Sequence, residues 1–322
     1  MDATAMAIVA AQAATVLALA PLLAGIAARW KAWTESRRGP SILQPYYDLA
    51  KYLRKEAIRP QGASRVFVVA PFVAFAAYMI IAVIVPVITP YPILVASLAD
   101  FLGGGLLFGL AGAVTLLAAL DSSSNYPALG ASRAVAFAAF AEPTLIIVFF
   151  GVAVITGTNN PYVTNNVLAG SWDWYLSPTH ILVMAGFFLL ILFETGKLPV
   201  ESAGLAEFGM LDEGRIYEHS GPLLGLFRWN GWLKQFLLFS VFVNVFAIPW
   251  GMASAPTLAA AGVNIVLLLA KLLALTAIIV ALEATLAKVR LFKIRDYLAV
   301  SFSLAVLAIF AFAVLGGPLG GS

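Results

Sequence analysis

Cysteine is absent from the 322-residue sequence, and histidine occurs only twice. Without cysteine the chain has no disulfide, no thiolate metal site and no ligands for an Fe–S cluster. His180 and His219 would need to meet in the fold to bind a haem, and the topology predicted below places them at opposite membrane faces. The sequence has neither a GxxxxGK(S/T) phosphate loop nor a strand-flanked GxGxxG, so it predicts no nucleotide site.

Charged residues are also scarce. They make up 11% of the sequence, whereas hydrophobic residues make up 62% and the mean hydropathy is +0.95. An ordinary soluble domain is about 25% charged, so this composition predicts a membrane protein. The first apolar stretch, residues 3–28, is longer than the core of a signal peptide, and only Asp2 precedes it as a charge. We therefore expect it to be the first membrane span.

Eight hydrophobic runs are long enough to cross a bilayer, which takes about 20 residues of helix. They lie near residues 4–28, 66–89, 98–120, 131–156, 178–196, 232–252, 258–286 and 297–316. We predict an all-α integral membrane protein with about eight transmembrane helices, in a single polytopic domain over residues 1–322. In the third run, Gly105, Gly109 and Ala113 form a small-residue face that favours close helix packing.

The 19 lysines and arginines predict the orientation, because cytoplasmic loops carry the positive excess. Nine of them lie between the first two runs, whereas the alternate connections 90–97, 157–177 and 253–257 contain none. Both termini are therefore expected outside, with long charged loops in the cytoplasm. These are loop 29–65, in which the pattern around Tyr47–Glu56 predicts an amphipathic helix at the surface, and the acidic loop 197–231.

Ionisable side chains inside a span cost roughly 2.5–3.5 kcal/mol on insertion scales, so each is a functional hypothesis. Glu142 lies in mid-span, and Pro143 removes a backbone donor and leaves carbonyls where water can gather. A carboxylate beside water is a candidate proton carrier, because a desolvated acid holds its proton more readily. The alternative is an interhelical hydrogen bond with no role in transport.

Lys271 and Glu283 lie in one run, about 18 Å apart along a helix axis, so they cannot pair with each other. Lys271 is either a proton-relay lysine or the counter-charge of Glu142 or Glu194. Two basic residues follow Glu283, which favours a surface ion pair over a relay.

Three loop segments carry further motifs. The first loop contains RRGPSILQPYYDLAKYLRKE (37–56), the third connection contains LDSSSNYPALGASRAVAFAAFAEPT (120–144), and the fifth contains FETGKLPVESAGLAEFGMLDEGRIYEHSG (193–221). Together they resemble the membrane-anchor subunit shared by respiratory complex I, where it is the H-type (ND1-like) subunit, and the energy-converting group 4 NiFe hydrogenases, including formate hydrogenlyase. The resemblance runs over most of the chain. The short first loop and the Gly-x-Ser-Arg and Ala-Glu-Pro-Thr patterns are more similar to the hydrogenase branch, and the fifth connection departs from the family pattern around 201–206.

The resemblance implies a non-catalytic subunit of an oxidoreductase complex in a prokaryotic cell membrane, without a metal or flavin of its own. The partners it implies are an Fe–S small subunit and a large NiFe catalytic subunit on the cytoplasmic side and antiporter-like subunits in the membrane, and no nucleic acid. A proton or ion path is expected along Glu142, Glu194, Glu201, Glu207, Glu213 and Glu218, to which we add Lys271. Residues expected to dock partners or to support the site are Arg37, Arg38, Asp48, Asp121 and Arg133.

Physical arguments leave two interpretations of the acidic loop. Carboxylates brought close together hold protons more readily, which favours a relay. Alternatively, the acids meet basic residues of a partner, for about 0–1 kcal/mol per exposed pair. For the whole chain we predict an anchoring and coupling subunit of a membrane-bound hydrogenase that links redox chemistry to H+ or Na+ translocation. The alternatives are a quinone-site subunit of complex I proper, a related sulfur reductase, and a free-standing secondary transporter, although the sequence lacks the internal repeats typical of the last.

Overall fold

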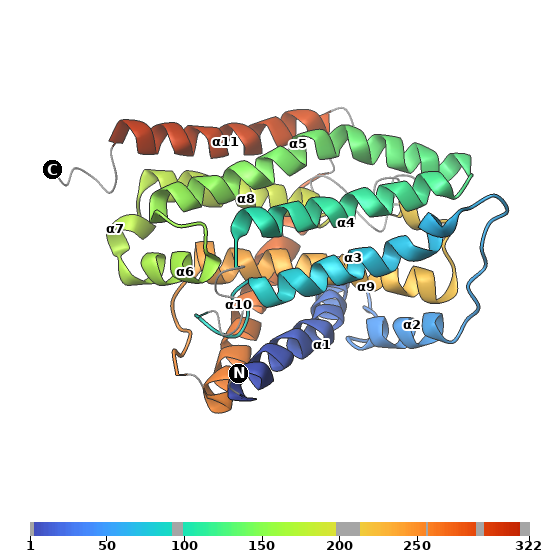
Figure 1. The fold of residues 1–322 in the computed structure, drawn as a ribbon, viewed down its shortest axis with the longest axis horizontal. Coiled ribbons are helices and arrows are strands. Elements are labelled where there is room, and N and C mark those ends of the chain that lie inside the picture. The colour runs from blue at the N-terminus through green and yellow to red at the C-terminus, as the bar shows by residue number, and fades with distance from the viewer. Residues whose placement is uncertain (1–2, 92–98, 198–212, 256, 288–292, 316–322) are drawn as a thin grey trace.

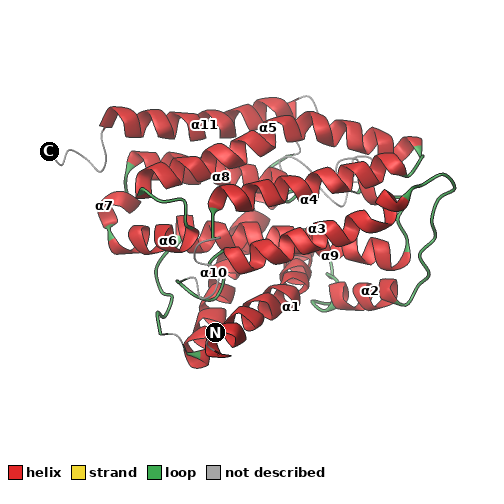
Figure 2. Cartoon of the chain, in the orientation of Figure 1, coloured by secondary structure: helices red, strands yellow, loops and turns green. Residues whose placement is uncertain are grey.

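The structure is a computed structural model that describes residues 3–91, 99–197, 213–255, 257–287 and 293–315. Within these ranges every regular element is a helix, as predicted (Figure 2). The long helices are α1 (Ala3–Thr34), α3 (Arg65–Ile84), α4 (Phe101–Asp121), α5 (Asn125–Thr156), α8 (Pro178–Glu194), α9 (Gly221–Val241), α10 (Leu258–Thr285) and α11 (Ile294–Leu315). The short elements are α2 (Gln44–Leu53), α6 (Pro161–Gly170), α7 (Trp172–Tyr175), a 3-10 turn η1 (Gly214–Ile216) and a π-helix η2 (Phe242–Ala247).

Each of the eight predicted spans falls on one of the long helices. Among the described residues, six helices are long and apolar enough to cross a membrane, namely α1, α3, α4, α5, α10 and α11. Helix α8 is apolar but shorter, with 17 residues, and α9 carries Arg228 and Lys234 in its interior. The count of eight spans and the orientation of the termini and loops therefore stay predictions.

Local sequence signals explain where several helices begin. The side chain of Ser64 accepts a hydrogen bond from the backbone N–H of Val66 at the start of α3, and Asp100 caps α4 in the same way. Such caps satisfy the amide groups that a helix leaves without a partner in its first turn. Proline, which lacks the N–H that would be left over there, occupies the first turn of α2, α6, α8 and α9.

The helices pack in a bundle with α8 and α9 at its centre (Figure 1). Helix α11 packs against α5 and α8, helix α4 packs against α3 and α5, and α9 packs against α1 and α3. Helices α1 and α10 pack together along one edge of the bundle. Phe187 and Leu190 of α8 and Phe236 and Phe239 of α9 are almost completely buried in the resulting core.

The structure differs from the sequence-based expectations in four places. The span expected at 66–89 ends as a helix at Ile84, and residues 85–90 continue in a buried, non-helical segment. The connection 157–177, expected to be a loop, contains α6 and α7. Helix α9 begins at Gly221, so residues 221–231 of the expected acidic loop are helical. Helix α5 also runs without interruption through Pro143.

Candidate functional site

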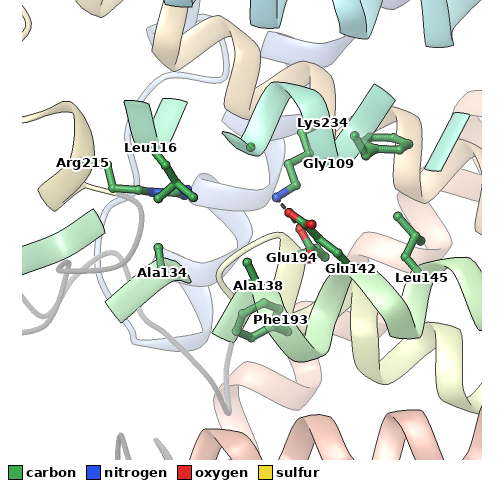
Figure 3. A pocket seen from close by; sticks show the side chains of 12 residues that line it. Gly109, Leu116, Ala134, Ala138, Glu142, Leu145, Phe193, Glu194, Arg215 and Lys234 are labelled. Atoms are coloured by element: carbon green, nitrogen blue, oxygen red, sulfur yellow. Dashed lines mark ion pairs between the residues drawn. The ribbon is translucent and has the colours of Figure 1, made fainter. Parts of the chain in front are cut away.

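A cavity of about 80 Å³ lies between α4, α5, the end of α8, and α9. Four charged residues are among those that line it: Glu142 of α5, Glu194 at the end of α8, Arg215 of η1 and Lys234 of α9. Figure 3 shows the side chains of Glu142, Glu194 and Lys234 converging, with Arg215 farther along the cavity. A cavity needs only about 10–15 Å³ to hold a water molecule, so water fits beside the carboxylates.

Lys234 is the counter-charge at the centre of this cavity. Its Nζ atom lies 2.5 Å from Oε2 of Glu194, and the two side chains are 23% and 16% exposed. Bulk solvent screens a partly buried pair less than a surface pair. Glu142 lines the same cavity, so the ammonium group of Lys234 lies near the carboxylates of both Glu142 and Glu194.

Glycines of α4 make room for the Glu142 carboxylate. A Cβ atom on Gly109 would lie 3.7 Å from Cδ of Glu142, and one on Gly105 would lie 3.5 Å from the ring of Phe149, also on α5. The predicted small-residue packing face is thus confirmed at these two positions. It brings α4 close to α5 and also forms one wall of the cavity.

A second cavity, of about 220 Å³, continues from the first toward η1. The two share Gly112, Glu194, Arg215 and Lys234 in their linings. Their combined space, which we call the charged cavity, is lined by Glu142, Glu194, Glu213, Arg215, Arg228 and Lys234 together with uncharged residues.

The far end of the charged cavity holds a second ion pair. Arg228 donates through both terminal nitrogens to the carboxylate of Glu213, with Nη2 2.7 Å from Oε2. Two parallel hydrogen bonds fix this geometry more firmly than a single contact would. Glu213 immediately precedes η1, so this ion pair ties the start of η1 to α9.

The predicted path residues are brought together only in part. Glu142, Glu194 and Glu213 line the charged cavity. Glu218 lies in the turn before α9 and is not among the lining residues of either cavity. Glu201 and Glu207 lie outside the described residues.

Lys271 is the predicted path residue that the fold places elsewhere. Its Nζ donates to the carbonyl oxygen of Ile248 at 2.7 Å and to Oδ1 of Asn244 at 3.3 Å. The ammonium group beside Glu194 belongs to Lys234, so the interpretation of Lys271 as the counter-charge of these glutamates was wrong. The reason is topological, since Lys271 packs where α9 gives way to the π-helix.

Glu283 forms an ion pair, as expected, but its carboxylate is buried and not at the surface. Its partner is Lys31 of α1, at 3.3 Å, and the glutamate side chain is only 5% exposed. Lys288 and Arg290 lie outside the described residues.

Around Lys271, buried carboxamides hold the non-helical segment 85–90. Without such donors its carbonyl groups would lack partners inside an apolar bundle, which costs several kcal/mol per group in a membrane. The side-chain nitrogens of Gln12, Asn244 and Asn264 donate to the carbonyls of Val85, Pro86 and Ile88 at 3.0, 3.0 and 2.9 Å. Asn165 of α6 donates to the carbonyl of Pro249 at 3.1 Å. We call Gln12, Asn165, Asn244, Asn264 and Lys271 the amide cluster.

Two predicted support residues have a clear structural role. Oδ2 of Asp121 accepts hydrogen bonds from the backbone N–H groups of Ser64 and Phe67 at 2.8 and 3.0 Å, and so ties the end of α4 to the start of α3. Asp48 of α2 accepts a hydrogen bond from Gln44 at 2.9 Å.

The predicted basic support residues lie away from both cavities. Arg37 and Arg38 are exposed, and Arg37 pairs with Glu35. Arg133 is partly buried on α5 and does not line either cavity.

A left-handed turn connects Glu194 to a second group of charges. The backbone N–H of Lys197 donates to the carbonyl of Leu192, and Gly196 adopts a φ of +60° that suits glycine. The pKa of Lys197 is lowered because burial disfavours its charge and Lys31 repels it, although Glu283 acts in the opposite direction. The turn therefore places Glu194 in the charged cavity and Lys197 near the Lys31–Glu283 pair.

The two histidines contact different parts of the fold, as the predicted topology required. His219 stacks on Phe67 with ring centroids 3.9 Å apart, and its ring meets Phe227 edge-on. Burial lowers the pKa of His219 to about 4. His180 instead contacts Tyr175 of α7, and Figure 1 shows α7 at the end of the bundle away from α2.

Sequence reasoning missed Arg215 of η1 and, on α9, two further site residues, Lys234 and Arg228. They were counted among the loop charges or placed at the start of a hydrophobic run. The signal that could have found the two on α9 is Pro222, a first-turn proline that starts the helix early, followed by Arg228, Gly231, Lys234 and Gln235 at helical spacing. All four line the second cavity.

Comparison with known proteins identifies the family. The sequence matches the family model described as NADH dehydrogenase over residues 6–314, and the chain belongs to this family. Hydrogenase-4 component C of Escherichia coli (strain K12) is 33% identical over 304 residues, covering 92% of this chain and 93% of the relative. Formate hydrogenlyase subunit 4 of the same organism is 32% identical over 285 residues, covering 87% and 90%.

A solved structure extends the comparison to the fold. A chain in the structure of the membrane-bound sulfane sulfur reductase, an archaeal respiratory membrane complex, has the same fold, with a TM-score of 0.80 at 20% identity. The match covers 95% of this chain and 99% of that one. The predicted resemblance is confirmed, and the chain is a multi-pass membrane protein.

Proposed function

We propose that this chain is the anchoring and coupling subunit of an energy-converting oxidoreductase complex, most closely of the membrane-bound NiFe hydrogenase type. In that role it docks an electron-transfer arm and links redox chemistry to the translocation of H+ or Na+. The observation that carries the proposal is the charged cavity. It joins Glu142, in the interior of α5, to Glu213, in the acidic loop immediately before η1, through spaces of about 80 and 220 Å³.

The charges in this cavity suit a stepwise relay. A proton that binds Glu194 removes the negative charge that holds Lys234. The ammonium group then favours the ionised form of Glu142, which lines the same cavity, so Glu142 can release its own proton. A charge that appears near Glu213 on a docked redox subunit would start this sequence from the other end.

The remaining parts of the proposal rest on the relatives and on the charge pattern of the loops. The two Escherichia coli relatives are named as components of hydrogenase-4 and formate hydrogenlyase. We infer by this likeness an Fe–S small subunit and a NiFe large subunit on the cytoplasmic side, and antiporter-like subunits in the membrane of a prokaryotic cell. The absence of Lys and Arg from alternate connections supports eight spans with both termini outside.

The test is Glu142→Gln in the complete complex, reconstituted into vesicles. We expect the complex to assemble and ion uptake to fall to the level of vesicles without it, measured with a pH-sensitive dye and with radioactive sodium in parallel. Glu35→Gln is the matched control, because Glu35 is exposed and its ion-pair partner among the described residues is the more exposed Arg37. Unchanged uptake by the Glu142 variant would reject the relay.

A further inference from the structure

An open groove of about 450 Å³ lies between the ends of α1 and α10, away from the charged cavity. Its floor is Ala277, Val280 and Ala281 of α10, whose spacing puts them on one helix face. Ala277 and Ala281 are exposed and small, so the groove is a strip of hydrocarbon surface at the edge of the bundle. Its shape and lining suit an acyl chain.

The groove has an aromatic rim. Trp30, Trp33 and Thr34 line the side of the groove that α1 forms. Trp33 is 56% exposed. Tryptophan is enriched where hydrocarbon meets the lipid headgroups, because its ring is apolar and its N–H is polar. The rim therefore marks the depth at which a lipid headgroup would lie.

One cation lies at this rim, and a second follows in the turn after α1. The guanidinium group of Arg29 lies 5.3 Å from the ring centroid of Trp33. The turn after α1 folds back onto the helix, because Arg37 donates its backbone N–H to the carbonyl of Ala32 at 2.8 Å, and it carries the exposed Arg38. Among the described residues, neither Arg29 nor Arg38 is paired with a carboxylate.

The neighbouring charges are already engaged with acids of the chain. Lys31 pairs with Glu283, which also fastens the ends of α1 and α10 together, and Arg37 pairs with Glu35. The groove is thus held at a fixed width and has surplus positive charge at headgroup level.

We propose that this groove binds an anionic phospholipid, with one acyl chain along Ala277 and Ala281 and the headgroup phosphate at Arg29 and Arg38. Charge decides between this occupant and an uncharged one. A neutral lipid or an apolar helix of another subunit would fill the floor but would leave both arginines without a counter-ion. Basic sites between membrane helices near the cytoplasmic surface are typical sites for anionic headgroups. The proposal does not depend on which complex the chain belongs to.

The experiment uses the purified complex, equilibrated with an equimolar mixture of phosphatidylglycerol and phosphatidylcholine in detergent and examined by native mass spectrometry. We expect phosphatidylglycerol to be retained several-fold over phosphatidylcholine. Ala281→Phe, which fills the groove, should remove about one phosphatidylglycerol per complex. Ile278→Phe is the matched control, because Ile278 is exposed on the same helix but does not line the groove.

A second variant tests the headgroup separately and leaves the groove intact. Arg29→Gln with Arg38→Gln should bring the retention of the two lipids to parity without lowering their total number. The proposal is overturned if the unaltered complex retains both lipids equally, or if Ala281→Phe retains as much phosphatidylglycerol as Ile278→Phe. Release of a protein subunit by Ala281→Phe, with no change in bound lipid, would show that a protein fills the groove and would also overturn it.

Discussion

Helix α9 and the π-helix that follows it connect two polar regions of opposite character. Around Lys234, carboxylates, an ammonium and guanidinium groups surround a cavity wide enough for water. Around Asn244, about 15 Å farther along the helix axis, carboxamides and Lys271 bond directly to backbone carbonyls of broken helices. Among the described residues, no carboxylate takes part in the bonds of the amide cluster.

The two regions differ in whether their side chains can gain or lose protons and exchange partners. The carboxamides that make up most of the amide cluster do not titrate, so the hydrogen bonds they donate stay the same at any physiological pH, and Lys271 is the titratable member of the cluster. Carboxylates beside water can gain and lose protons, and an ammonium group can exchange one partner for another. We therefore expect the amide cluster to determine stability and the charged cavity to determine ion coupling, and four substitutions test that division.

The largest effect on stability is expected from Asn244→Leu. The change removes the donors to the carbonyls of Pro86 and Val87, at 3.0 and 3.2 Å. Each buried carbonyl left without a partner costs about 1–3 kcal/mol, so the loss is about 2–6 kcal/mol. Thermal melting of the purified complex should show it as a clear fall in the midpoint, or as failure to assemble.

Asn166→Leu is the matched control for this change. Asn166 is exposed and donates one bond, to the carbonyl of Pro90 at 3.2 Å. We expect it to cost less than about 1 kcal/mol, because water replaces the lost partner. Equal losses in the two variants would mean that the amide cluster does not hold the broken helices.

The next effect concerns acid stability and His219. Its folded-state pKa is lowered from about 6.5 to about 4, so the unfolded chain binds this proton more readily. Above pH 6.5 the neutral His219 therefore adds roughly 3 kcal/mol to the free energy of unfolding. This contribution is lost as the pH falls toward 4. His219→Phe keeps the aromatic stack on Phe67 and should make melting less sensitive to pH between 6.5 and 4.5.

Melting at pH 7.5 is the reference condition for this substitution, because the histidine is neutral there in both states. A variant that remains as acid-sensitive as the unaltered protein would contradict the assignment. It would place the acid response in the charged cavity instead.

A smaller loss of stability, with a large loss of coupling, is expected from Lys234→Met. The change leaves Glu194 without its ammonium partner in a partly buried place, at a cost of about 1–3 kcal/mol. The cavity would then lack the ammonium group that lies between Glu194 and Glu142, and ion uptake by vesicles should fall to background. Lys234→Met with Glu194→Gln should recover the melting temperature without recovering uptake.

Arg228→Met is the comparison variant, since it breaks the ion pair with Glu213 at the wider end of the cavity. Its side chain is more exposed, at 34%, so we expect a weaker effect on uptake. An equal effect would mean that both ion pairs act in one step.

The smallest effect is expected from Gly109→Ala. The new Cβ would lie 3.7 Å from Cδ of Glu142, which is an ordinary van der Waals distance, so stability should change by less than about 0.5 kcal/mol. The methyl group narrows the cavity beside the carboxylate and should slow ion uptake measurably without stopping it. Unchanged uptake would show that this wall of the cavity is not part of the path.

Hydropathy predicted the helical spans well because each long helix is apolar over most of its length. It placed the start of the sixth span too late, because Arg228 and Lys234 interrupt the apolar pattern of α9. These two cations become site residues only when α9 packs beside the end of α8. Glu142 and Glu194 could be found from the sequence because a charge within or beside an apolar run is conspicuous.

The carboxamides of the amide cluster, unlike its member Lys271, escaped prediction for a different reason. Asparagine and glutamine carry no charge, so they do not stand out in a hydrophobic run as Glu142 does. Their bonds also join distant parts of the chain, for example Asn264 to Ile88 across 176 positions. A break such as that at 85–90 is visible only after the donors that support it have been placed in space.

The short turn at Gly196 has a mechanical consequence. Glu194 and Lys197 lie three positions apart, and they belong to two separate groups of charges, one at Lys234 and one at the Lys31–Glu283 pair. The backbone bonds of the turn make it a stiff link. A displacement of the chain at Lys197 is therefore passed to Glu194 across a turn of only a few residues, so the two groups of charges are mechanically coupled.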